Sequence, residues 1–319
     1  MIANSIVRIV IYTLVILVLL GILLAGIFAG KFFTNISLET SGGNVASVGS
    51  VPADEIQKLK VEWVAGSITV QTADTDEITF SETEDVSEKQ KMVWKQSGDT
   101  LTLQFCQSNS FLGINFGFNS NISKDLVITI PEDWVASEVS IDSVSARINI
   151  SDLETTELNL TNVSGYCVIA NCVASNVDVE TVSGEIDYTG TLSALDLESV
   201  SADCTLTLTT GARDISMECV SGDLTLYLPE NQGFTAKVDG LSGDITTDFA
   251  TTVSGGTHTY GDGSCRINAS GVSGNINIRK AAHVHTWNEG TVQDIPGESR
   301  QEMVYTCTGC GETKSEPVE

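Results

Sequence analysis

A segment of twelve residues recurs seven times along the chain, and this repeat constrains the fold more than any other feature. The shared pattern is apolar, x, apolar, x, x, Val, Ser, Gly, x, apolar, x, apolar, as in "VDVETVSGEIDY". Successive serines of the pattern lie 18 to 21 residues apart until a last interval of 31, and a period of about 20 is typical of repeat architectures. These serines are Ser145, Ser164, Ser183, Ser201, Ser221, Ser242 and Ser273.

Each copy contains two short runs of alternating apolar residues, and an alternation of period two indicates a strand with one buried face. A single pair of such strands cannot bury its apolar side. Stacked copies pair each strand with its counterpart about 4.8 Å away and enclose a continuous core. We therefore predict an all-β fold, a parallel β-solenoid (β-helix-like) with rungs of about 19–21 residues.

Stacking also predicts the direction of individual side chains. The third and tenth positions of the pattern, such as Val179 and Ile186, should point inward from every rung. In the copy "TVSGEID" we expect Val182 to fill the core, Ser183 to hydrogen-bond within the turn, and Gly184 to permit close packing.

The repeated Val-Ser-Gly is interpreted as a structural corner. Ala146 and Ala202 replace the glycine in two copies, so we attribute the small residue to close packing and not to a positive φ. Catalysis by serine needs one nucleophile beside one base, which seven equivalent serines and three histidines do not fit. Cys167 and Cys204 share the tenth column, and we expect both to be buried as small apolar side chains.

Two outward rows of carboxylates flank the corner, at the fourth and ninth positions. Like charges stacked about 4.8 Å apart repel, and Ca²⁺, which takes oxygen ligands, would relieve the repulsion. The alternative is a solvated acidic face that keeps the protein soluble. We favour this alternative, because the chain contains no compact D-x-D-x-D-G loop of the kind that binds Ca²⁺. The candidate cation-binding residues are Glu180, Glu185, Glu198, Asp203, Glu218, Asp223, Asp239 and Asp244.

The N-terminal region predicts a membrane anchor. Residues 9–30 contain no charged side chain, and at about 1.5 Å per residue a helix of this length spans a bilayer core of roughly 30 Å. A cleaved signal peptide is the alternative, but its apolar stretch is shorter, and Ile27 does not fit an A-x-A-like site before Ala29. We predict a cytoplasmic N-terminus at residues 1–8, an anchor at 9–30 and a linker at 31–55.

The remaining composition narrows the partners. The chain carries 16 Lys and Arg against 42 Asp and Glu, a net charge of −26, so a nucleic acid would be repelled. An acidic body rich in Ser and Thr behind one N-terminal anchor is associated with surface proteins. We therefore expect a single-pass protein of the cell membrane whose C-terminal body is extracellular.

The tail, residues 281–319, departs from the repeat. Two imidazoles and two thiolates form a candidate tetrahedral Zn²⁺ set, namely His283, His285, Cys307 and Cys310. The alternative is a flexible acidic tail with a reducible pair of cysteines. The tail resembles a small repeat of surface proteins from Gram-positive bacteria, with an H-T-W start and a Y-T-C-x-x-C-G end, although the further cysteine found midway in many copies is missing here.

The segments "KLKVEWVAGSITV", "DTLTLQF" and "LVITIPEDWVASEVSIDSVSARINI", followed by the V-S-G-D-I rungs, resemble the bacterial "putative adhesin" domains of unknown function, also called toast-rack-like. We assign residues 56–280 to this domain. The resemblance implies a protein of the bacterial envelope involved in adhesion or envelope stress, and it carries over no catalytic residue.

The function that these features predict is non-enzymatic binding of an unknown envelope or host-surface component, with no required cofactor beyond a candidate Zn²⁺ in the tail and a candidate Ca²⁺ on the acidic face. Two alternatives stay open. One is a carbohydrate-active enzyme on a parallel β-helix, for which the chain offers only Arg147, Arg213, Arg266 and the loop after residue 248. The other is an architectural spacer that holds the tail away from the membrane.

Overall fold

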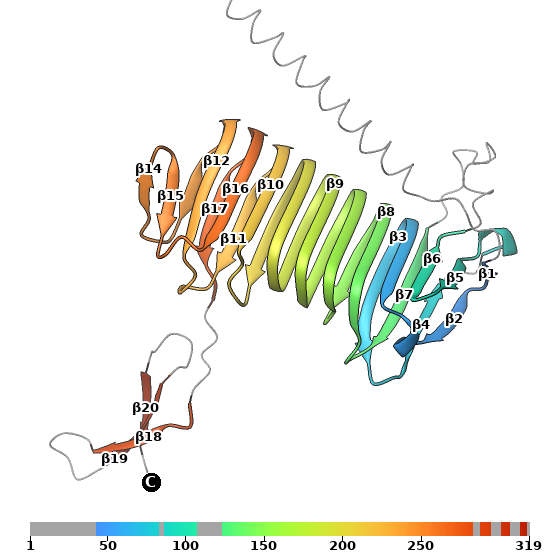
Figure 1. Ribbon diagram of the computed structural model, residues 1–319, viewed down its shortest axis with the longest axis horizontal. Helices are drawn as coiled ribbons and strands as arrows, with labels where there is room; N and C mark the ends of the chain where they lie inside the picture. Colours follow the sequence, from blue (N-terminus) through green and yellow to red (C-terminus); the bar gives the residue numbers. More distant parts are fainter. Residues whose placement is uncertain are drawn as a thin grey trace, which may run out of the picture.

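The computed structural model describes residues 43–82, 86–106, 123–282, 288–294, 301–306 and 313–317. Hydrogen bonds join seventeen strands into one continuous system, and three further strands form a separate sheet. In Figure 1 most of the chain forms a row of stacked rungs. No helix within the described part is long and apolar enough to cross a membrane, and the predicted anchor at residues 9–30 lies outside that part.

The central rungs are built by β3 (Lys58–Ala73), β8 (Val135–Ser151) and β9 (Glu154–Leu208), which runs through three copies of the repeat. All of these pairings are parallel and follow the register that the repeat predicts. Ile141 of β8 pairs with Leu160 of β9, and Ile148 pairs with Cys167. On its other side β8 pairs with β3, which is the degenerate first rung.

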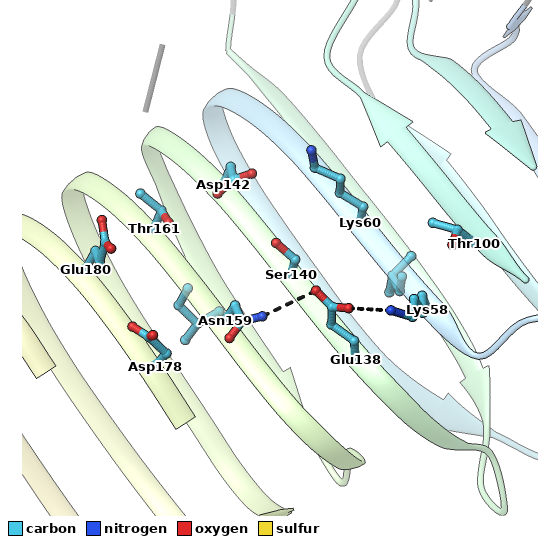
Figure 2. A pocket seen from close by; sticks show the side chains of 12 residues that line it. Lys58, Lys60, Thr100, Glu138, Ser140, Asp142, Asn159, Thr161, Asp178 and Glu180 are labelled. Atoms are coloured by element: carbon cyan, nitrogen blue, oxygen red, sulfur yellow. Dashed lines mark hydrogen bonds and ion pairs between the residues drawn. The ribbon is translucent and has the colours of Figure 1, made fainter. Parts of the chain in front are cut away.

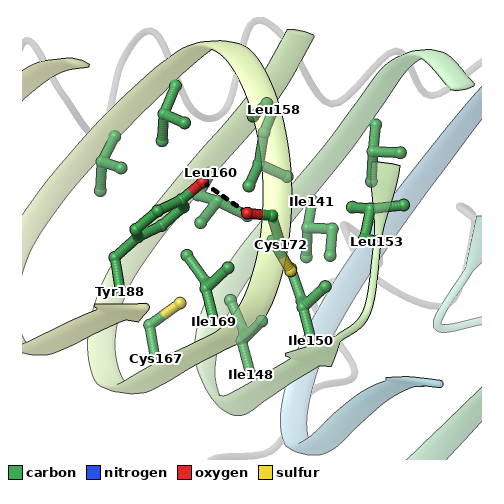
Figure 3. Packing of buried hydrophobic residues seen from close by; sticks show 14 of the residues in the cluster. Ile141, Ile148, Ile150, Leu153, Leu158, Leu160, Cys167, Ile169, Cys172 and Tyr188 are labelled. Carbon is green, nitrogen blue, oxygen red and sulfur yellow. Dashed lines mark hydrogen bonds between the residues drawn. The ribbon is translucent and has the colours of Figure 1, made fainter. Parts of the chain in front are cut away.

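The core lies between two layers of strands, one before and one after each corner, and Figure 3 shows its side chains meeting from both layers. The third and tenth positions point inward, as predicted. They are at most 5% exposed from Ile141 to Met217 and from Ile148 to Leu224, whereas Val238, Ala269 and Ile245 near the C-terminal end are only half-buried.

All six cysteines that the structure describes are free and buried, among them Cys167 and Cys204. Burial disfavours a thiolate, and it raises the pKa of Cys167 to about 12. Both side chains therefore pack as small apolar groups, as predicted, and their thiols are unreactive at neutral pH.

The corner itself differs from the prediction in its phase. Thr181 is 4% exposed, whereas Val182 is half-buried, so the prediction that Val182 fills the core was wrong. The first, third and fifth positions point inward before the corner, and the tenth and twelfth after it. Four residues of turn therefore change the parity of the alternation, which a strict period of two cannot show.

The glycine of the corner is constrained in two ways. A Cβ on Gly184 would lie 2.1 Å from the carbonyl oxygen of Gly165 in the preceding rung, which confirms close packing. Gly184 also has a φ of +146°, and Gly165 and Gly222 are similar. Ala146 and Ala202 are not among the described residues with positive φ, so the corner exists in two backbone forms, and the sequence prediction missed one of them.

The rungs at the C-terminal end are not stacked in sequence order. The rung of β10 (Asp214–Ser221) and β11 (Leu224–Leu228) pairs with that of β16 (Cys265–Ser273) and β17 (Ile276–Lys280). The rung of β12 (Phe234–Ser242) and β13 (Ile245–Thr247) pairs with the far side of β16 and β17. The last copy of the repeat is thus inserted between the two before it, as Figure 1 shows.

The long interval before the last copy closes this end of the stack. β14 (Thr252–Ser254) and β15 (Thr257–Tyr260) form a hairpin, and β15 pairs antiparallel with the outer edge of β12. Phe234, Phe249 and Tyr260 pack together there with ring centroids 4.7 to 5.7 Å apart. These rings form an aromatic plug over the end of the core.

The N-terminal end is closed by shorter strands. They are β1 (Asn44–Val45), β2 (Val48–Pro52), β4 (Glu77–Glu82), β5 (Val93–Ser97), β6 (Thr100–Gln104) and β7 (Lys124–Pro131), with 3-10 turns η1 (Ala53–Glu55) and η2 (Glu88–Gln90). β6 and β7 pair parallel with β3, and the others pair antiparallel around them. Residues 44–55, which the sequence assigned to a linker, therefore belong to this cap.

A buried ion pair joins two strands of this cap, β4 and β7, and contacts Trp63 of the first rung. The Nζ atom of Lys124 lies 2.6 Å from a carboxylate oxygen of Glu82, and both side chains are fully buried. Lys124 also donates to the carbonyls of Gln90 and Phe105, and its ammonium lies 4.9 Å from the ring centroid of Trp63. We call this group the ionic clasp; Glu82 and the two carbonyls are hydrogen-bond partners of the buried ammonium.

The tail contributes β18 (Thr291–Asp294), β19 (Gln301–Thr306) and β20 (Thr313–Pro317), which form an antiparallel sheet. The predicted zinc ligands His283, His285, Cys307 and Cys310 lie outside the described residues.

Candidate functional site: a polar groove along the outer face

The outward side chains of the layer before the corner form a regular grid. Each rung contributes three of them, two residues apart, and successive rungs place them in columns. Lys60, Ser140 and Asn159 pair in turn, and so do Asp196, Ser216, Asn268 and Lys237 at the other end. With Asp178 the middle column reads Lys60, Ser140, Asn159, Asp178, Asp196, Ser216, Asn268, Lys237.

This face is hollowed over seven rungs. A cavity of about 470 Å³ extends from Lys58 and Thr100 to Glu180, and another of about 510 Å³ extends from Glu157 to Asn268. Both are lined by Asn159 and Asp178, so they adjoin. We call the two together the outer groove. Its lining is mostly polar and charged, unlike the apolar pockets that hold most small molecules.

Ion pairs connect the rungs at the two ends of the outer groove. At the N-terminal end Lys58 Nζ lies 2.9 Å from Glu138, which also accepts a hydrogen bond from Asn159 (Figure 2). The hydrogen bond and the charge of Glu138 raise the pKa of Lys58. At the C-terminal end Arg266 donates to one carboxylate oxygen of Asp214 through two nitrogens, at 2.6 and 3.2 Å.

Asp142 is a partly buried carboxylate at the N-terminal end of the groove. Partial burial raises the pKa of Asp142 above its ordinary value, because the charged form loses hydration, while the positive charge of Lys60 acts against this rise. Figure 2 shows Asp142, Thr161 and Glu180 following one another down successive rungs.

The predicted fourth-position carboxylates Glu180, Glu198 and Glu218 lie along this face. Asp239 does not follow Glu218, because Ser270 of the inserted rung pairs with both. Asp178 and Asp196, at the second position, also lie on this face and were not among the predicted residues. Their signal was available, since they share the outward parity of Glu180 and Glu198.

The ninth-position row lies across the corner, so the structure does not bring the two predicted rows together. Here a carboxylate bonds to the next rung. Asp203 accepts the backbone N–H of Asp223 at 2.9 Å, Asp223 accepts that of Asn275 at 2.9 Å, and Asn275 accepts that of Asp244 at 3.2 Å. Glu185 is exposed at the start of this row. We call this chain of contacts the corner ladder.

The seven repeated serines all occupy corner positions, and those at 145, 164, 201 and 273 are exposed. Ser145 donates to the carbonyl of Val64 at 3.3 Å. Other corner bonds come from the fifth position: Ser143 accepts the N–H of Ala146 at 3.0 Å, and Thr181 donates to the carbonyl of Ser183 at 3.3 Å.

Within the described residues, no group of three or more His, Cys, Asp or Glu side chains converges closely enough to hold a metal ion. The carboxylates of the outer groove and of the corner ladder are therefore spread out. Calcium binding by these faces stays a prediction.

Comparisons with known proteins follow the same boundaries. A family model described as Toastrack DUF4097 matches residues 56–279. Among solved structures, a "putative cell adhesion protein" from Clostridium sporogenes is 14% identical, with a TM-score of 0.36, over 75% of this chain and 100% of that one. A "putative adhesin" from Bacteroides fragilis is 12% identical, with a TM-score of 0.33, over 75% and 98%.

A third solved structure, a "putative lipid binding protein" from Parabacteroides distasonis, is 13% identical, with a TM-score of 0.31, over 76% of this chain and 98% of that one. No curated protein matches the chain.

Proposed function

Since the chain belongs to the toast-rack family DUF4097, we propose that it is a membrane-anchored, surface-exposed β-solenoid that binds another envelope or host-surface component without catalysing a reaction. The outer groove carries this proposal. A groove lined by side chains from successive rungs presents the same kinds of group again and again, and this suits an extended partner better than one small substrate.

The location proposed for the protein rests on the sequence. Residues 9–30 supply the anchor, and the acidic body lies outside the cell. The test is digestion of intact cells with a protease, followed by detection of the full chain. Loss of the body with survival of the anchor is expected. Complete protection of the body on intact cells, with digestion only after lysis, would place the body on the cytoplasmic side of the membrane.

The binding role is tested with the full-length protein on cells. The groove variant replaces Asp178 and Asp196 by Asn and Glu180 and Glu198 by Gln. A control variant, Asp74→Asn, Asp133→Asn, Glu132→Gln and Glu154→Gln, removes the same number of carboxylates from exposed positions elsewhere. Loss of envelope or surface binding by the groove variant alone supports the proposal. Equal binding by the wild type, the groove variant and the control variant contradicts the proposal and favours the alternative function, an architectural spacer.

The metal proposals concern other residues. His283, His285, Cys307 and Cys310 supply a set of ligands suited to Zn²⁺. Metal analysis of the purified chain should find about one zinc per molecule, lost on replacing both cysteines by Ser. Calcium titration followed by calorimetry tests the acidic faces, and the absence of both heat and a melting shift would exclude a Ca²⁺ site.

A further inference from the structure

The distribution of charge in the outer groove is uneven along the stack. Cations lie only at the ends: Lys58 and Lys60 on the first rung, Arg266 on the inserted rung and Lys237 on the last. Lys58, Arg266 and Lys237 each form an ion pair with a carboxylate of the same face, at 2.6 to 2.9 Å. The ends of the groove are therefore largely neutralised by the protein itself.

The middle of the groove has a different composition. In the four rungs from Glu157 to Glu218, the three outward positions contain no Lys or Arg. Two consecutive rungs there place Asp178, Glu180 and Asp196 in the groove and Glu198 beside it. Carboxylates on neighbouring rungs are separated by about 4.8 Å, and those two residues apart on one strand by roughly 6.7 Å. The field of this central segment favours a cationic partner.

The spacing of the carboxylates suits several cationic groups better than a single metal ion. A calcium ion needs its ligand oxygens within about 2.6 Å, whereas no described cluster of carboxylates converges in that way. An extended peptide that lies along the stack crosses a rung about every 4.8 Å, and its side chains on one face repeat every 6.6 to 6.8 Å or so, so successive lysines meet carboxylates of different rungs. Lysine side chains are long enough to reach carboxylates on either neighbouring rung.

The groove presents little apolar side-chain surface. Leu59, Leu160, Val177 and Leu195 are among its lining residues, but their side chains point into the core and are at most 5% exposed. A partner would therefore be held mainly by the polar and charged groups of the outer face. The seven rungs of the groove span about 29 Å, which matches roughly eight or nine residues of extended peptide.

We infer that the central outer groove binds an extended, lysine- or arginine-rich peptide segment of a partner protein. This inference rests on the proposed function, since it names the partner of the same groove. Binding is expected to be electrostatic in origin, to weaken with salt, and to depend on Asp178, Glu180, Asp196 and Glu198 together.

The test uses the full-length protein in detergent micelles and a fluorescent decapeptide of alternating Lys and Thr, with binding followed by anisotropy. The wild-type protein is expected to bind it, with Kd rising about tenfold between 50 and 300 mM salt. The groove variant should weaken binding about tenfold or more, and the control variant of equal charge less than about twofold.

Three results would overturn the inference: no binding of the decapeptide by the wild type, equal weakening by the groove and control variants, or equally tight binding of spermine, which would assign the groove to polyamines. Unchanged thermal unfolding checks that each variant is folded; if the groove variant unfolds, Asp178→Asn with Asp196→Asn replaces it. If the groove variant loses cell-surface binding while the wild type ignores the decapeptide, the proposed function survives and this inference fails.

Discussion

The two ends of the stack solve the same problem with different chemistry. Each end rung has an edge and an open core that would otherwise meet water. The N-terminal end is closed by six short strands held by the ionic clasp of Lys124 and Glu82. The C-terminal end is closed by one hairpin and an aromatic plug. A buried charge tolerates no loss of its partner, whereas a cluster of rings loses stability gradually.

The largest effect is expected at the N-terminal end. Lys124→Met leaves Glu82 buried without its counterion, and the free energy of unfolding should fall by about 3 to 5 kcal/mol. Denaturant unfolding measures this. The double variant Lys124→Met with Glu82→Met should be more stable than the single one, and a double variant that is equally unstable would contradict the role of the pair.

A substitution between the ends provides a reference for both. Gly184→Ala places a Cβ 2.1 Å from the carbonyl of Gly165 at a φ of +146°, and should cost about 2 to 3 kcal/mol. The control is Gly98→Ala, where the added Cβ meets no atom within 4 Å, although φ is +61°. If thermal unfolding shows equal losses for both, strain in φ and not the contact between rungs is responsible.

The aromatic plug should respond more weakly than the clasp. Phe249→Leu keeps an apolar side chain but removes ring contacts with Phe234 and Tyr260, at a cost of about 1.5 kcal/mol. The loss, measured by denaturant unfolding, should not depend on salt. If Phe249→Leu lowered the free energy of unfolding as much as Lys124→Met does, the two ends would contribute equally to stability.

The inserted rung near the C-terminal end can be tested through the corner ladder. Asp223 accepts hydrogen bonds from the backbone and side-chain nitrogens of Asn275, so Asp223→Ala should cost about 1 kcal/mol. Amide exchange should quicken at Asn275 and not at Ile148. Unchanged exchange at Asn275 would show that the ladder does not hold the inserted rung in place.

The smallest expected effect is a gain in stability, on replacing Asp142 in the outer groove beside the N-terminal cap. The folded pKa of Asp142 lies above its ordinary value of 3.8, chiefly through burial, so the folded state binds the proton more tightly than the unfolded chain. Its contribution to stability therefore falls as pH rises through this range. Asp142→Asn should stabilise by roughly 0.5 kcal/mol at neutral pH and not at pH 3 or below; a loss at neutral pH would reverse the sign.

Much of the rung architecture was predictable because its signals are local. Alternation of period two and the spacing of the corners specify which residues of a copy point inward, as Ile141 and Ile148 do. Which corner residue points into the core was not predictable. The backbone of the turn, and not the alternation of the strands, buries Thr181 and leaves Val182 half-buried. Glu180 of the groove and Glu198 beside it were found from their column, whereas Asp178 and Asp196, which line the groove, were overlooked.

The amino-acid sequence by itself determined that this protein stacks similar rungs, since each copy carries the same alternation of apolar residues. Only the tertiary structure decided their order. The repeat pattern alone lets any two copies pair, so the order of the rungs depends on which copy fits under the C-terminal hairpin. The copy with Phe234 lies at the end, under the aromatic plug. The copy with Ile267 and Ile276 is buried between two neighbouring rungs. The same choice places Asn268 before Lys237 in the groove.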